Sequence, residues 1–190
     1  MIITADKQTT EYIYTIDGND IIRSVNEDFE SFARANDGRE LAGGSVIGRS
    51  LWNYVTGELT KGYYKNLISA VRENRESITL PFRCDAPSLR REMIMELRPG
   101  EDESIQFICR MNQSAPREPV EAISKTSKKS DRFLSMCSWC KRVELPDQGW
   151  MDIEEAIQID PLLSRDPYPQ FTHGICSECM AQQKKLIAKE

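Results

Sequence analysis

Four cysteines near the C-terminal end form two C-x-x-C pairs, Cys137 with Cys140 and Cys176 with Cys179. Two cysteines at this spacing, bent around a tight turn, can both direct sulfur at one ion, at about 2.3 Å when the ion is zinc. Two such pairs complete a tetrahedral shell of four thiolates, which is the closed pattern of a structural zinc site. Iron also accepts thiolate ligands, so iron in place of zinc stays open. We predict a structural Zn²⁺ site at these four residues.

Redox-active pairs and local disulfides are the alternative uses of the four thiols. Disulfides are disfavoured because the chain begins without the apolar segment of a secretion signal, and reducing compartments select against them. Haem attachment is disfavoured because Lys141 follows Cys140. His173 is the only histidine, three residues before Cys176. We expect it to hydrogen-bond a thiolate or simply to pack, and its replacing one cysteine as a ligand is the weaker alternative.

Length and composition indicate a globular protein with room for one ordinary domain and a smaller one. The chain has 190 residues, of which 39% are hydrophobic and 29% charged, with a net charge of −5. This mildly acidic balance disfavours nucleic acid as a partner. No run approaches the ~18 apolar residues of a membrane span. We therefore expect a cytoplasmic protein that does not associate with membranes.

Patterns of apolar residues and turn residues predict mostly strands and helices in the first 112 residues. Strands alternate polar and apolar residues, whereas helices repeat apolar residues every three or four positions. Asp17-Gly18 predicts a hairpin turn, and Asn26 predicts an N-cap. The expected elements are strands at 11–17 and 20–25, a helix after Asn26, a short helix within 45–55, a helix at 58–74, and strands at 77–84, 89–97 and 104–110.

This order, with the Asp17-Gly18 turn, Asn26 and the stretch from Val46 to Tyr54, resembles a PAS domain over residues 8–112. The resemblance implies an α+β fold, a five-stranded antiparallel sheet with helices on one face. PAS domains serve as sensors that hold a small ligand or cofactor, or that dimerise, and the fold alone does not name the ligand. The aromatic residues expected between helices and sheet, as core or as a ligand cavity, are Phe29, Phe32, Trp52, Tyr54 and Tyr63.

Three arginines lie around the proline turn that joins the third and fourth expected strands. Arg83, Arg90 and Arg91 could bind an anion there, although charges at the edge of a sheet also serve to prevent pairing with other sheets.

The stretch after the PAS-like span, 113–130, is polar and contains two prolines. Because it lacks an apolar stripe, we predict a linker.

Residues 131–190 form a segment too short to depend on a hydrophobic core alone, so a metal staple has a clear role. We expect a strand, a turn with the first cysteine pair, a second strand, a helix from Trp150, a loop with Pro167 and Pro169, and a final helix near Cys179. This arrangement resembles treble-clef and zinc-ribbon modules. It also resembles a C-terminal tail of bacterial PAS and receiver-domain signalling proteins.

Signals for catalysis are missing from the sequence. There is one histidine, and neither a P-loop nor a G-x-G-x-x-G or G-x-S-x-G motif occurs. We therefore expect a non-enzymatic protein of bacterial signal transduction, in which a PAS-like sensor is coupled to a zinc module that contacts a partner protein. A homodimer through the PAS-like part is also expected. The alternatives are a thiol–zinc redox sensor and a DNA-binding regulator that uses Lys184, Lys185 and Lys189 of the last helix.

Overall fold

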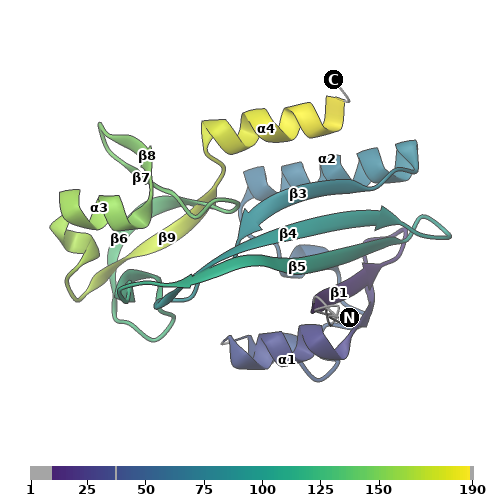
Figure 1. Ribbon diagram of the computed structural model, residues 1–190, viewed down its shortest axis with the longest axis horizontal. Helices are drawn as coiled ribbons and strands as arrows, with labels where there is room; N and C mark the ends of the chain where they lie inside the picture. The colour runs from purple at the N-terminus through teal and green to yellow at the C-terminus, as the bar shows by residue number, and fades with distance from the viewer. Residues whose placement is uncertain (1–9, 37, 189–190) are drawn as a thin grey trace, which may run out of the picture.

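The computed structural model describes residues 10–36 and 38–188 and contains two sheets (Figure 1). The larger sheet is antiparallel, with strand order β2-β1-β5-β4-β3, and the smaller has the order β8-β7-β6-β9. The described strands and α-helices are β1 (Glu11–Ile16), β2 (Ile22–Val25), α1 (Glu27–Ala35), α2 (Glu58–Asn74), β3 (Ile78–Arg83), β4 (Leu89–Pro99), β5 (Ile105–Pro116), β6 (Lys129–Cys137), β7 (Val143–Leu145), β8 (Gly149–Met151), α3 (Ile153–Ile159), β9 (Tyr168–Gly174) and α4 (Ser177–Ala188).

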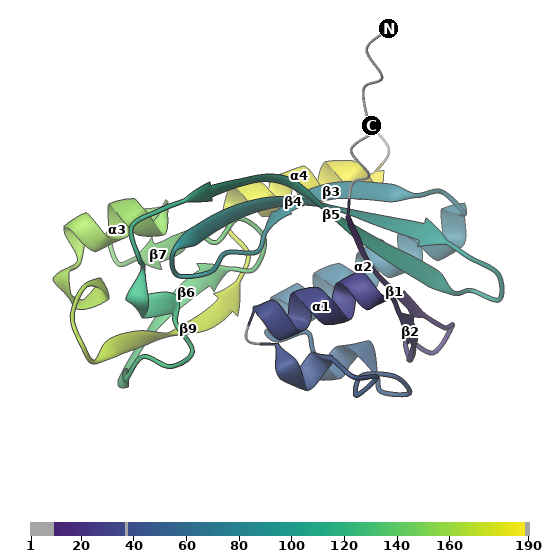
Figure 2. The ribbon, with the colours of Figure 1, turned by 60° about the horizontal axis from the view of Figure 1, so that its bottom comes forward.

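Short 3-10 helices lie between these elements: η1 (Arg39–Leu41), η2 (Leu51–Asn53), η3 (Glu121–Ile123) and η4 (Pro161–Leu163). Helices α1 and α2 lie beneath one face of the larger sheet (Figure 2). The predicted α+β fold with a five-stranded antiparallel sheet is thus confirmed. We call β1 through β5, with α1 and α2, the N-terminal unit, and β6 through α4 the cysteine module. Residues 8, 9 and 37 of the predicted PAS-like span, and residues 189 and 190 of the predicted module, including Lys189, lie outside the described residues.

The core of the N-terminal unit forms where α2 faces the sheet. The apolar residues of α2 recur at helical spacing, so Leu67, Ile68 and Val71 all point inward and are at most 2% exposed. They pack against alternate residues of the central strand β5, including the fully buried Phe107. Among the described residues, no helix is long and apolar enough to cross a membrane.

Asn26 begins α1 as predicted and also ties the helix to β1. Its Oδ1 accepts hydrogen bonds from the backbone N–H groups of Phe29 (2.9 Å) and Ile13 (3.0 Å), while its Nδ2 donates to the Glu11 carbonyl (2.8 Å). One side chain therefore satisfies two backbone donors and one acceptor.

Replacing Asn26 with alanine should lower the free energy of unfolding by about 2 kcal/mol, because a lost cap costs up to about that amount and a second donor loses its partner. Asn26→Asp keeps the acceptor for both N–H groups but sets a carboxylate oxygen, which cannot donate, against the Glu11 carbonyl, so it should recover only part of the loss. Urea unfolding of both variants checks this order. Equal losses for the two variants would contradict the capping role of Oδ1.

The turn between β1 and β2 differs from the prediction. Positive φ occurs at Asp20 (60°), and Gly18 is not at positive φ. The Asp17 side chain organises the turn instead, because its Oδ1 accepts hydrogen bonds from the N–H groups of Asn19 (2.9 Å) and Ile21 (3.0 Å). The predicted two-residue turn was therefore too short.

Residues 113–130, predicted as a linker, are largely built into the structure. Strand β5 continues to Pro116, which pairs with Leu89 at the start of β4. Val120 is 3% exposed and Ala122 is fully buried, both in the core of the cysteine module. Two apolar side chains in a polar stretch thus anchor the connection.

The cysteine module departs from the expected order in two places. Trp150 belongs to strand β8, and α3 begins only at Ile153. The predicted loop with Pro167 and Pro169 ends at Tyr168, where β9 begins parallel to β6. Since β9 is an edge strand, it tolerates a proline that a central strand would exclude.

Candidate metal centre

The four predicted cysteines converge. The sulfurs of Cys137, Cys140, Cys176 and Cys179 all lie within 4.8 Å of one another. The Cys140 and Cys176 sulfurs are 3.7 Å apart. Four sulfurs arranged tetrahedrally at about 2.3 Å from zinc are separated by about 3.8 Å, so the donor set fits a Zn(Cys)₄ site. All six cysteines of the chain are free thiols.

A tight turn presents the first pair. Strand β6 ends at Cys137, whose carbonyl accepts a hydrogen bond from the N–H of Lys141 (3.1 Å) and whose N–H donates to the Arg142 carbonyl (2.8 Å). Lys141 has φ 61°, in the left-handed region, and so reverses the chain just after Cys140. We call residues 137–142 the knuckle.

The parallel pairing of β9 with β6 brings the second pair to the knuckle. Cys137 is level with Gly174 in the sheet, and the N–H of Ser138 donates to the Gly174 carbonyl (2.9 Å). The chain then turns into α4, which begins directly after Cys176 and contains Cys179 in its first turn. The missed strand β9 is therefore the element that joins the two pairs.

Backbone donors favour thiolates at this site. The N–H of Cys176 points to the Cys137 sulfur and the N–H of Cys179 to the Cys176 sulfur, both at 3.5 Å. The start of α4 adds the positive end of a helix dipole. Cys137 and Cys176 are at most 1% exposed, which shields the site from solvent.

Thiols this close cannot all lose their protons without a cation. Hydrogen bonds from Cys140 and then Cys179 lower the pKa of Cys137. The hydrogen bond with Cys137 raises the pKa of Cys140 to about 12, and the hydrogen bond between Cys137 and Cys179 raises the pKa of Cys179 strongly. Loss of the first proton, from Cys137, is thus favoured, and loss of a second proton from Cys140 or Cys179 beside that negative charge is disfavoured. A divalent cation supplies the charge that lets four thiolates coexist.

His173 lies on β9, opposite Met136, and is not a member of the sulfur group. Burial lowers the pKa of its imidazole, and the charge of Lys141 lowers it further. His173 lines a cavity beside Trp139. A role for His173 in supporting a thiolate stays a prediction.

The knuckle packs into the core of the N-terminal unit. Trp139 is 5% exposed, and its ring lies edge-on to Tyr63 (5.0 Å between centroids) and tilted against Tyr64 (5.2 Å). The N–H of Arg83 in β3 donates to the Trp139 carbonyl (2.7 Å). The hydroxyls of Thr60 and Ser138 are 2.8 Å apart. Sequence patterns gave no sign of the Thr60 contact, because hydroxyl pairs carry no periodic signature.

The three arginines proposed for an anion are paired with groups of the chain itself. Arg83 contacts Asp85 (2.5 Å) and Asp152 (3.0 Å), and Arg90 contacts Asp152 (3.6 Å). Arg91 donates to the Cys84 carbonyl (3.2 Å) and to Asn36, and lies over the ring of Phe32. Arg83 and Arg91 are each 6% exposed and already pair with groups of the chain, and an anion contact at these arginines stays a prediction.

The five predicted cavity aromatics fall into different places. Phe29 and Tyr54 line a cavity of about 200 Å³ between helices and sheet. Phe32 lines, with Phe29, a larger cleft of about 370 Å³ next to α1. Trp52 instead donates its indole N–H to Asp20 (3.0 Å), and Tyr63 packs on Trp139. Only part of the predicted set therefore faces the cavity between helices and sheet.

Comparisons with known proteins leave the family open. No family model matches the chain, and no curated protein matches it. Among solved structures, the chain is similar to the crystal structure of a sensory box sensor histidine kinase from Vibrio cholerae, with 16% sequence identity and a TM-score of 0.37. The match covers 56% of this chain and 82% of that chain. So distant a likeness says nothing of function.

Proposed function

We propose that this protein is a non-enzymatic signal sensor, in which the PAS-like N-terminal unit is coupled to a zinc-stapled module that contacts a partner protein. One observation carries the proposal. The knuckle that holds two of the four clustered sulfurs also places Trp139 between α2 and β3 of the N-terminal unit. A conformational change in the N-terminal unit therefore alters the packing of Trp139 and so reaches the cysteine module, and the reverse also holds.

The metal has a structural role in this proposal. A shell of four cysteines leaves no open position for substrate, so zinc fixes the knuckle and the start of α4 relative to each other. A signal acts by favouring one arrangement of the Trp139 contact over another, since a ligand shifts a conformational equilibrium only through different affinities for two states.

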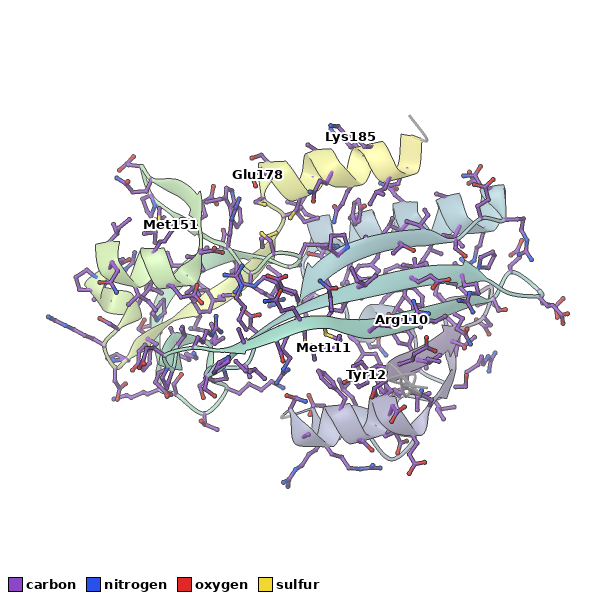
Figure 3. All side chains as sticks on the ribbon, in the orientation of Figure 1. Tyr12, Arg110, Met111, Met151, Glu178 and Lys185 are labelled. Atoms are coloured by element: carbon purple, nitrogen blue, oxygen red, sulfur yellow. The ribbon has the colours of Figure 1, made fainter. Side chains whose placement is uncertain are left out.

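The module offers a surface for a partner. Phe133, Ile159 and Leu162 are exposed by 58%, 52% and 49%, more than most large apolar side chains of the chain. Figure 3 shows Glu178 and Lys185 on α4, on the side away from α2, where they add charge to the same module. Exposed apolar and charged groups together support contact with a protein.

Removing the metal tests the coupling. A strong chelator should raise amide hydrogen exchange in the module and also in the first turns of α2, around Thr60 and Tyr64, because these residues contact the knuckle. The β1–β2 hairpin, for which the described residues show no hydrogen bond to the knuckle, should keep its exchange rates. Faster exchange confined to the module would contradict the coupling, and unchanged exchange everywhere would contradict the staple.

The redox-sensor alternative has one observation in its favour. Cys140 is half-buried and its sulfur lies 3.7 Å from that of Cys176, so these two thiols are placed to react once metal is lost. Zinc that stays bound after peroxide treatment would exclude this alternative. The DNA-binding alternative stays a prediction.

A further inference from the structure

Helix α4, which lies along α2, loses apolar contacts after its first turn (Figure 1). The first turn buries Cys179, a member of the sulfur group, and partly buries Met180. Among residues 181–187, the side chains turned inward are Gln183 and the partly buried Ile187, which packs against the core of the N-terminal unit. The later part of α4 therefore brings one polar and one apolar side chain to this contact.

Gln183 is buried without hydrogen bonds. The residue is 2% exposed, and neither its Nε2 nor its Oε1 has a partner among the described residues. A buried amide that has lost water and gained no partner carries its full desolvation cost. Three residues further on, Leu186 is 38% exposed. The helix thus buries a glutamine and leaves a leucine in water, which is the reverse of stable helix packing.

Polar groups around this contact share the incomplete pairing. Four of the described residues have a buried side-chain polar atom without a hydrogen-bond partner, and three of them are Gln183, Tyr63 of α2 and Trp139 of the knuckle. The rings of Tyr63 and Trp139 pack on each other. Because buried polar groups in native proteins are almost always paired, the contact between α2, α4 and the knuckle is less favourable than apolar burial alone suggests.

Polar contacts hold the knuckle to the N-terminal unit but do not extend along α4. Gly57, directly before α2, has φ 82°, and a Cβ atom there would lie 2.6 Å from the His173 carbonyl oxygen. The backbones therefore meet closely at this point. Within the described part of the chain, by contrast, no hydrogen bond or ion pair joins residues 181–188 to another element. Side-chain packing alone keeps this part of α4 in place.

We propose that residues 183–188 form a displaceable strap, which leaves α2 and unfolds while the first turn of α4 stays at the metal centre. The anchor is Cys179, which lies in the sulfur group. Helical segments shorter than about 12 residues are marginal without tertiary contacts, so release from α2 and unfolding of the strap occur together. Release uncovers the part of the N-terminal core against which Ile187 packs.

The strap rests on the proposed function only for its role in signalling. In that function, release of the strap is the output that a partner protein detects, because it changes the surface next to the metal centre. Release itself requires only the weak contact of Gln183 and Ile187 with the N-terminal unit.

Amide hydrogen exchange of the zinc-loaded full-length protein tests the strap. In the wild type, the amides of residues 184–188 should exchange at least about tenfold faster than those of α2 near Leu67, since local opening precedes global unfolding. Gln183→Met keeps the helix propensity and needs no hydrogen bond, so it should slow exchange in the strap by about tenfold. Gln182→Met is the matched control. Gln182 is exposed, so the same change there should alter exchange by less than about twofold.

Gln183→Glu changes the same position in the opposite direction. A buried carboxylate without a counter-charge is less favourable than the amide, so exchange in the strap should become faster while the zinc content stays at about one ion per chain. Faster exchange in Gln183→Met would show that the amide has a partner and would overturn the strap. Equal protection of α4 and α2 in the wild type would overturn it as well. Zinc content measured on the same samples separates these outcomes from failure of the zinc staple, which would appear as protein without zinc.

Discussion

Replacing Cys137 with serine should remove zinc from the protein and unfold the cysteine module. A serine hydroxyl is a poor zinc ligand, and the remaining three thiols lose the closed tetrahedral shell. Apparent free energies of structural zinc binding are about 10–16 kcal/mol, far more than the stability that a segment of this length obtains from its own core. We expect the zinc content to fall from about one ion per chain toward zero.

The effect should extend beyond the module. Cys137 is fully buried and packs in the same core as Leu67 and Phe107 of the N-terminal unit. Loss of the knuckle therefore exposes apolar surface on α2 and β3. The N-terminal unit should then melt at a lower temperature, by about 2–4 °C for each kcal/mol by which its free energy of unfolding falls. Circular dichroism should show the loss of α4 before heating starts.

Cys84→Ser is the matched control. Cys84 is a free, partly buried thiol that lies outside the sulfur group, so the same chemical change there should leave the zinc content unaltered. Elemental analysis and thermal melts of both variants make the comparison. A Cys137→Ser protein that retains full zinc and a native melt would mean that the four sulfurs do not share an ion.

How far the sequence predicts this structure depends on the range of each interaction. Asn26 as an N-cap and the C-x-x-C pairs are local patterns, and both were read correctly because the partners lie within a few residues. Strand β9 was missed because proline at Pro169 signals a loop unless a neighbouring strand is known. The contact of Trp139 with Tyr63 joins residues far apart in the chain, and no local pattern carries it.

The arginines near the β3–β4 turn show the same limit, because a sequence does not reveal which distant groups will neutralise a charge. Arg83, Arg90 and Arg91 were interpreted as a possible anion contact, although Asp85, two residues after Arg83, is one of the partners of Arg83 and only partners such as Asp152 and Asn36 come from other elements. Asp152 in the cysteine module and Asn36 at the end of α1 become visible only in three dimensions. A charge cluster in a sequence therefore predicts a need for counter-charges, and the fold decides whether a ligand or the chain itself supplies them.

Replacing Asp85 with alanine should destabilise the protein by about 3–5 kcal/mol, because it leaves buried arginines without their counter-charge. The Asp85 side chain is 3% exposed and contacts Arg83 (2.5 Å) and Arg117 (3.2 Å), whose side chains are 7% and 8% exposed. It also accepts the N–H of Arg91 (3.1 Å). Urea unfolding measures the loss, and Glu58→Ala is the control. Glu58 pairs with Lys61 at the surface with 91% of its side chain exposed, so that loss should stay below about 1 kcal/mol.

The location of the Asp85 network gives the same variant a second expected effect. Arg83 continues from Asp85 to Asp152 (3.0 Å), and Arg117 continues to Glu154 (2.8 Å), so the network joins the β3–β4 turn to α3 of the cysteine module. Without Asp85, the two parts lose part of the connection that makes them unfold together. We expect near-ultraviolet and far-ultraviolet transitions to separate in the variant and to coincide in the wild type. If the transitions coincide and the free energy of unfolding falls by less than about 1 kcal/mol, the network contributes no more than surface salt bridges do. Trp139 would then be the main link between the N-terminal unit and the metal centre.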